Sequence, residues 1–171
     1  KPNHYFSTDL LKKNKDYYLR FGGSPSLTVE NLTQLTLHLK NENNGLIKGN
    51  IHIDTSRFKP AYYPNGTSYD DLGWYYAAPD TAVILGENAA TYDLISATEL
   101  GKPVTIKPKK DEKQLTLIND VITVSQEDAK KHCSLNIEIK AHNTLRLYGC
   151  VAQTKNPKTI HLAMPDPAFF A

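Results

Sequence analysis

Apolar and polar residues alternate in many short runs along this chain, and a period of two is typical of half-buried β-strands. The segment HYFSTDLLKKNKDYYLRF predicts two strands joined at Asn14–Asp16, and GLIKGNIHID predicts another strand with alternating isoleucines. The residues Gly22-Gly23-Ser24-Pro25 then break the strand pattern after the first pair. Further strand-like runs lie downstream: AVIL, TYDLISA, PVTIK, QLTLI, VITV, SLNIEIK, TLRLYG and TIHLAM.

One segment, SLTVENLTQLTLHLKNENNG, carries leucines at helical spacing instead. It predicts a helix over about residues 28–41, with Thr28 as the N-cap and Gly45 just past the end. A second, short helix is expected near Gln126–Lys131. We therefore expect an α+β, β-rich fold of antiparallel sheets and hairpins with one clear helix.

The C-terminal residues PDPAFFA look like the start of a helix, with Asp166 as N-cap and Pro167 at the first helical position. Two phenylalanines then end the chain. This ending indicates a piece of a larger, multidomain protein; the alternative is a tail that folds back onto the core.

Composition and charge exclude some classes of protein. The chain has 171 residues, 40% of them hydrophobic, and a formal net charge of +2. That charge is too small to indicate a nucleic-acid partner. No apolar run approaches the roughly 18 residues of a membrane span. No signal peptide is visible, so we expect a cytoplasmic protein or a mature piece of an exported one.

Cys133 and Cys150 flank two strand-like runs that a hairpin would bring together. Pairing the isoleucines of one run with the leucines of the other places Cys133 opposite Val151, one residue away from Cys150. A bulge at Gly149 would correct the register. We favour a disulfide, which implies an oxidising compartment, over two buried thiols.

Three short matches to catalytic motifs fail on their local context. Ser56 and Lys59 form S-x-x-K, the nucleophile-and-base signature of penicillin-recognising enzymes. These two residues must share one face of a helix, but Ser56 follows a strand and Lys59 precedes Pro60, which disfavours helical dihedrals. Two weaker matches fail as well. Ser134-Leu135-Asn136 fits S-x-N but lies in a predicted strand. Lys158-Thr159-Ile160 resembles K-T-G but lacks the glycine.

Metal and cofactor sites are not expected. His52 and Asp54 share one strand face, but no second cluster of ligands accompanies them. His132, beside a cysteine, also lacks a partner motif. We predict no cofactor and no metal.

The segment AYYPNGTSYDDLGWYYAAPD is the most unusual in the chain, with many aromatic residues around Asp70-Asp71. A carboxylate pairs with an ammonium group, and aromatic faces pack against its apolar stem. The segment thus fits a cationic, amphipathic ligand. From residue types alone we favour the alternative, an ordered loop whose tyrosines cover the core and whose acids face water.

Several phrases in one order carry a family resemblance: YYLRFGGSPSLT, GLIKGNIHIDTSRF, DDLGWYYAAPDTAVILGEN, LRLYGC and IHLAMPDPAFFA. Together they resemble the class C low-molecular-mass penicillin-binding proteins, D-Ala-D-Ala carboxypeptidase/endopeptidases of the type-4 kind. The resemblance spans nearly the whole chain. It departs at Ser24, a turn position where the family more often has Asp.

The resemblance implies a domain organisation. In this family a transpeptidase-like domain is interrupted, after its serine motif, by a long non-catalytic insertion. Residues 1–27 would lead from that domain, residues 28–153 would form the insertion, and residues 154–171 would return to it. Two small subdomains would meet near residues 80–100. The catalytic serine, lysine and K-T-G motif would all lie outside this chain.

The resemblance also implies substrate-binding residues. In the family, an Asp with an aromatic residue five positions later, just before [SA]-A-P, holds the amino end of a peptidoglycan side chain such as diaminopimelate. Asp71 and Tyr76 stand in those places, and Tyr69 would form a nearby aromatic wall.

The implied parent is a serine-type hydrolase outside the cytoplasmic membrane, periplasmic or extracellular. Its partners would be peptidoglycan stem peptides and, for the parent only, β-lactams. This chain alone would be inert and would shape the substrate cleft. The alternative is a free-standing secreted module that binds glycan or peptide.

Overall fold

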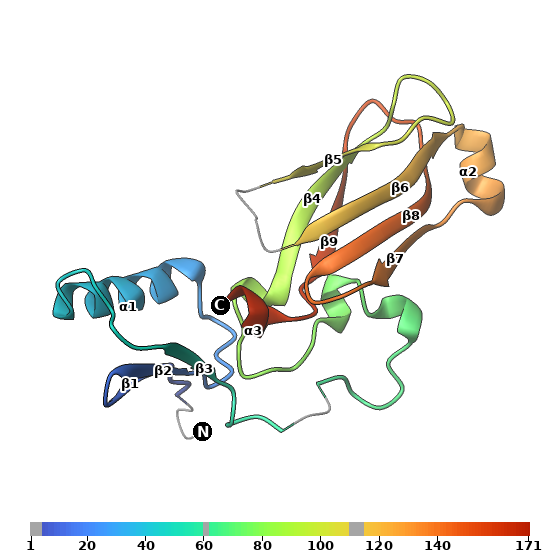
Figure 1. Ribbon diagram of the computed structural model, residues 1–171. Helices are drawn as coiled ribbons and strands as arrows, with labels where there is room; N and C mark the ends of the chain where they lie inside the picture. The colour runs from blue at the N-terminus through green and yellow to red at the C-terminus, as the bar shows by residue number, and fades with distance from the viewer. Residues whose placement is uncertain (1–4, 60–61, 110–114) are drawn as a thin grey trace. The chain divides into compact units, whose positions relative to one another are not determined.

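The chain folds into two compact units (Figure 1). The computed structural model describes residues 5–59, 62–109 and 115–171. Unit 1 comprises residues 1–62, 80–87 and 171, and unit 2 comprises residues 63–79 and 88–170. His4, Pro60, Ala61 and Gln114, which the sequence patterns include, lie outside the described residues.

Unit 1 contains a three-stranded sheet in the order β1-β2-β3. The strands β1 (Asp9–Lys13) and β2 (Asp16–Arg20) form the predicted hairpin, which turns at Asn14 with a φ of 58°. The third strand, β3 (Ile51–Asp54), pairs with β2 in parallel. A parallel neighbour needs a long crossover connection, and a helix supplies it here.

That crossover helix is α1 (Val29–Glu42), close to the predicted span. Thr28 caps its N-terminus: its hydroxyl accepts from the Asn31 N–H at 3.2 Å, and the Asn31 side chain accepts from the Thr28 N–H at 3.1 Å. At the other end the Gly45 N–H donates to the Lys40 carbonyl at 2.8 Å, and Asn44 adopts a φ of 50°. This is the Schellman pattern of a helix stop.

The AVIL run, residues 82–85, is not a strand, which corrects the expectation drawn from its composition. Ala82, Val83 and Leu85 are nonetheless buried, and the Ala82 carbonyl accepts from the Gly23 N–H at 2.8 Å. A short, uniformly apolar run signals burial but not the backbone conformation that achieves it.

Unit 2 contains two three-stranded sheets. In one, β4 (Ala89–Ile95) pairs antiparallel with both β5 (Thr105–Pro108) and β9 (Lys158–Ala163). In the other, β8 (Thr144–Ala152) lies between β6 (Thr116–Val124), to which it is parallel, and β7 (Leu135–Ile139), to which it is antiparallel. Two predicted runs, QLTLI and VITV, thus form the single strand β6.

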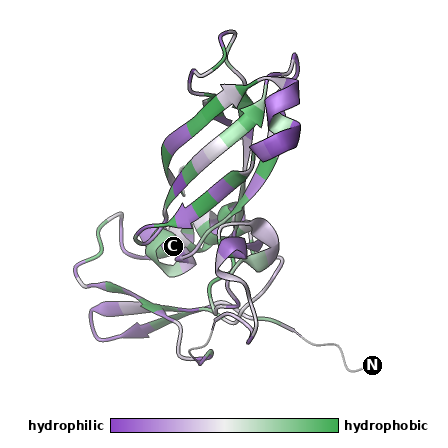
Figure 2. Cartoon of the chain, turned by 90° about the vertical axis from the view of Figure 1, so that its right-hand side faces the viewer, coloured by the Kyte–Doolittle hydropathy of each residue, from purple (hydrophilic) through white to green (hydrophobic). Residues whose placement is uncertain are grey.

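Alternating side chains of both sheets form one core in unit 2, and the strands in Figure 2 accordingly carry bands of opposite hydropathy. Leu145, Leu147 and Leu162 have no exposed surface. A fully buried leucine stabilises the fold by about 1.5–3 kcal/mol. The short helix α2 (Gln126–His132), capped by Ser125, follows β6 as predicted.

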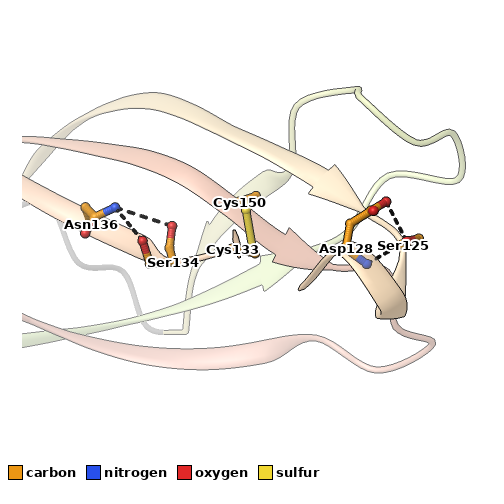
Figure 3. The surroundings of a disulfide bond; sticks show 6 residues. All are labelled: Ser125, Asp128, Cys133, Ser134, Asn136 and Cys150. Carbon is orange, nitrogen blue, oxygen red and sulfur yellow. Dashed lines mark hydrogen bonds between the residues drawn. A yellow bond between two sulfur atoms is a disulfide. The ribbon is translucent and has the colours of Figure 1, made fainter. Parts of the chain in front are cut away.

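Cys133 and Cys150 form a disulfide between the end of α2 and β8 (Figure 3). The pairing of β7 with β8 runs unbroken from Ile139–Leu145 to Leu135–Gly149, so the expected bulge is absent. Instead Gly149 has a φ of 98°, and a Cβ there would lie 2.0 Å from the Ser134 carbonyl oxygen. With this backbone, the Cα atoms of the two cysteines lie 5.4 Å apart.

The C-terminal helix α3 (Pro167–Phe170) begins as predicted, with the Asp166 carboxylate accepting from the Phe169 N–H at 3.2 Å. Phe170 packs against the core of unit 2, whereas Phe169 is 67% exposed and stacks on His142. The fold is therefore α+β and β-rich, as expected. None of the helices in the described residues is long and apolar enough to cross a bilayer.

Candidate functional site

Residues 63–79 of the acidic, aromatic loop belong to unit 2 and are anchored to two of its strands. The turns of the loop are η1 (Tyr69–Asp71) and η2 (Tyr75–Ala77). Between them, the Gly73 carbonyl accepts from the Ala163 N–H at 2.9 Å, and Trp74 forms a β-bridge with Leu162 of β9. A Cβ on Gly73 would lie only 2.2 Å from Ile137 Cγ2, so the loop backbone lies directly against β7.

The loop brings Asp71 and Tyr76 together. The Tyr76 hydroxyl donates to Asp71 Oδ1 at 2.9 Å. Backbone turns fix the aspartate on both sides: its N–H donates to the Ser68 carbonyl at 3.1 Å, and its carbonyl accepts from the Trp74 N–H at 2.9 Å. In the described part of the chain, no hydrogen bond reaches Asp71 Oδ2, so this oxygen can accept from a ligand.

The electrostatics of the pair agree with this geometry. The hydrogen bond to the Asp71 carboxylate raises the pKa of Tyr76 above its ordinary value, because the bond stabilises the protonated phenol. Tyr76 is 62% exposed. The pair is thus an accessible carboxylate with a fixed hydroxyl beside it, an arrangement that suits an ammonium group.

Tyr69 opens the same loop but is not part of the pair. Its side chain is 68% exposed, and within the described residues its ring neither makes a hydrogen bond nor stacks on another ring. The structure therefore brings together two of the three residues expected to bind substrate.

Two residues that the sequence reasoning missed adjoin the pair. The Tyr75 ring meets the Tyr76 ring edge-on at 5.6 Å, and it meets the His161 ring of β9 at 5.4 Å. Tyr75 could have been chosen from the loop, but His161 lies far away in the sequence. Only the packing of η2 against β9 reveals it.

Ser56 is not placed to act as a nucleophile. It lies in a turn after β3, where its N–H donates to Asp54 Oδ1 at 2.9 Å. No helix contains Ser56 or Lys59. Bonds from Ser56 and Arg20 hold the pKa of Asp54 well below its ordinary value, so this carboxylate is ionised and fully engaged.

The two weaker motif matches have ordinary structural roles. Next to Ser134, on the polar side of β7, the Asn136 amide donates to the Ser134 hydroxyl at 3.0 Å (Figure 3). Thr159 donates to Asp93 of the neighbouring strand at 2.7 Å. The first contact lies at the start of β7, and the second joins β9 to β4.

The histidine–aspartate pair on β3 also has structural partners. His52 stacks on Tyr18 at 4.6 Å, and Asp54 bonds to Arg20. Within the residues that the structure describes, no group of three or more His, Cys, Asp or Glu side chains could hold a metal ion.

Comparison with known proteins identifies the family. The D-Ala-D-Ala carboxypeptidase 3 (S13) family matches residues 1–171, the entire chain. The chain belongs to this family. The S13 match agrees with the resemblance seen in the sequence.

Two relatives show how much of a family member this S13 chain represents. It is 24% identical to D-alanyl-D-alanine carboxypeptidase DacB of Haemophilus influenzae over 97% of this chain and 36% of the relative. The crystal structure of penicillin-binding protein 4 (dacB) from that organism matches with a TM-score of 0.78 and 22% identity, over 95% of this chain and 36% of the other. The chain thus spans about a third of its relatives' length.

A second crystal structure of the Haemophilus protein is complexed with a novel β-lactam. It matches with a TM-score of 0.65 and 19% identity, over 93% of this chain and 33% of the other. Both structural matches show that the two units follow the fold of this part of the family.

Proposed function

We propose that this chain is the non-catalytic inserted region of a serine-type D-Ala-D-Ala carboxypeptidase/endopeptidase that acts on peptidoglycan peptides. Residues 28–153 form the insertion, and residues 1–27 and 154–171 connect it to the transpeptidase domain. The membership of the S13 family and the setting of Ser56 in a turn support this assignment.

The observation that carries the proposal is the Asp71–Tyr76 hydrogen bond on a loop anchored to β7 and β9. Asp71 binds the ammonium at the end of the diamino acid side chain of the stem peptide. Tyr76 holds one carboxylate oxygen in place, and the exposed ring of Tyr69 covers the apolar stem of the ligand. A hydrogen bond between charged groups contributes about 1.5–3 kcal/mol.

Chemistry in the parent protein occurs on polypeptide outside this chain. The serine of its S-x-x-K motif forms the acyl-enzyme, and β-lactams react at the same serine. The parent works in the periplasm or another extracytoplasmic space, and the disulfide is consistent with an oxidising compartment.

The test measures how Asp71→Asn in the full-length protein changes the hydrolysis of two pentapeptides that end in D-Ala-D-Ala. One peptide has lysine at the third position, and the other has norleucine. The second substrate lacks the ammonium but keeps the stem. The variant is expected to lower kcat/KM for the lysine peptide about tenfold or more, and to spare the norleucine peptide.

Asp70→Asn is the matched control, because it removes the same charge from the neighbouring, exposed residue. If Asp71→Asn and Asp70→Asn leave the preference for lysine equally intact, Asp71 does not bind the ammonium.

A further inference from the structure

Unit 2 contains a cavity of about 230 Å³ that is lined by strands of both its sheets and has the disulfide in its wall. Leu94 of β4, Leu135 of β7 and Val151 of β8 form apolar walls, and Ala129 of α2 adds to them. An apolar cavity of roughly 150 Å³ is enough to bind benzene. The cavity of unit 2 therefore has room for a ring or a short apolar chain.

The acidic, aromatic loop closes the neighbouring part of the space between β7 and β9. There Trp74 forms its bridge with β9, and the Gly73 backbone lies against Ile137 of β7. Nearer the start of each of these strands, Leu135 and Lys158 line the cavity instead. The loop thus fills one end of the space, and the cavity occupies the other end, beside the disulfide.

Lys158 places a cation on the core side of β9. Residues two apart along a strand share one face, and Ile160 and Leu162, which share the face of Lys158, are buried. Lys158 lies opposite the buried Leu94 of β4, and it lines the cavity while remaining exposed. A lysine in such a place packs its apolar stem against the wall and keeps its ammonium in contact with water.

Among the described residues, no carboxylate pairs with the Lys158 ammonium. Asp93, on β4, pairs with Lys109 at 3.8 Å. Glu127, on α2, pairs with Lys131 at 2.5 Å. The acids of the adjoining strand and helix are therefore engaged by other cations, and the charge of Lys158 is left for a ligand.

The hydroxyl groups that line the cavity satisfy one another. The Ser96 hydroxyl donates to the Thr154 carbonyl at 2.9 Å and accepts from the Thr154 N–H at 3.0 Å, and the Thr154 hydroxyl donates to the Asn156 carbonyl at 2.7 Å. The ammonium of Lys158 thus remains as the polar anchor. One cation beside apolar walls selects a ligand with one anionic group and an apolar body.

We propose that this cavity binds a small amphipathic carboxylate, whose apolar chain or ring lies against Leu94, Leu135 and Val151 and whose anionic group lies on the Lys158 ammonium. The charge-assisted hydrogen bond orients the ligand, and burial of its apolar part supplies the rest of the affinity. This site does not include the Asp71–Tyr76 pair, and it does not depend on the proposed function.

The test titrates the full-length protein, with labelled methyl groups, with octanoate and follows the methyl resonances of Leu94, Ala129 and Val151 by NMR. Saturable shifts of these resonances are expected. Lys158→Met keeps the stem but removes the charge, and it should raise the Kd about tenfold. Lys158→Arg keeps a cation and should retain most of the affinity. Octylammonium, which has the same chain and the opposite charge, should bind at least tenfold more weakly than octanoate.

An inward-pointing lysine on an edge strand such as β9 also prevents pairing with another sheet. The absence of saturable shifts would leave Lys158 with this role alone and would overturn the inference. An equal Kd for Lys158→Met and the original protein, or for octylammonium and octanoate, would also overturn it, because the chain would then insert without regard to charge.

Discussion

At the scale of single residues, Asp71 and Asp54 show what decides the use of a carboxylate. Asp71 accepts one hydrogen bond from Tyr76 and is held by turns on both sides, so one oxygen can accept from a ligand. Asp54 bonds to Arg20 through one oxygen and to the Ser56 backbone through the other. The first keeps one oxygen open to a ligand, and both oxygens of the second are engaged within unit 1.

Asp54 makes the stability of unit 1 sensitive to acid. Because its pKa is lowered in the folded state, its contribution is complete above the ordinary aspartate pKa of about 3.9 and is lost as the pH falls through the folded value. Asp54→Asn should therefore reduce hydrogen-exchange protection of the β2 and β3 amides at pH 7, and by less at pH 3.

The matched control for this prediction is Asp80→Asn, which changes an exposed carboxylate of the same unit. Hydrogen-exchange protection measured in Asp80→Asn at each pH corrects for the change of intrinsic exchange rates with pH. A loss in Asp54→Asn that is equal at pH 7 and pH 3 would show that the Arg20 and Ser56 contacts do not depend on the charge of Asp54.

Residue types alone were not sufficient to find the site. They favoured a loop that only covers the core, and only the family resemblance selected Asp71 and Tyr76. His161 had no local signal, because its place beside Tyr75 depends on the pairing of β9 with β4 and on the packing of η2. Such contacts join segments distant in sequence, which periodicity cannot report.

At the scale of elements, Gly73 determines where the acidic, aromatic loop lies. No Cβ fits between its backbone and Ile137, and its carbonyl accepts from Ala163. Gly73→Ala should push the loop away from β7 and cost about 1–3 kcal/mol of stability, as overpacking does. Asp71 would move with the loop, so the preference of the full-length protein for lysine over norleucine should fall.

Ser68→Ala is the control for Gly73→Ala, because Ser68 is exposed in the same loop and its side chain makes no capping bond. Thermal unfolding and the two-substrate comparison measure both variants. If Gly73→Ala matches Ser68→Ala in both measurements, the close contact with Ile137 does not position the loop.

Elements with local signals were predictable, and their partners were not. The cap at Thr28 and the stop at Asn43–Gly45 are encoded next to α1 itself, so its span was found. The parallel pairs β2–β3 and β6–β8 were not expected. A period of two reports that one face of a strand is buried, but it does not report which strand lies beside it or in which direction.

At the scale of the whole molecule, the chain is about a third of its relatives in length and folds into two compact units. In unit 2, the disulfide joins the end of α2 to β8 beside a core shared by two sheets. The acidic, aromatic loop on such a core holds the Asp71 carboxylate fixed, and under the proposed function a fixed carboxylate would lose little entropy on binding.

The most direct measurement is a crystal structure of the full-length protein after reaction with a penicillin whose side chain ends in an ammonium group. The account predicts that the acylated serine lies outside residues 1–171 and that the ammonium lies about 3 Å from the Asp71 carboxylate. An acyl group on Ser56, or an ammonium that points into solvent away from Asp71, would contradict it.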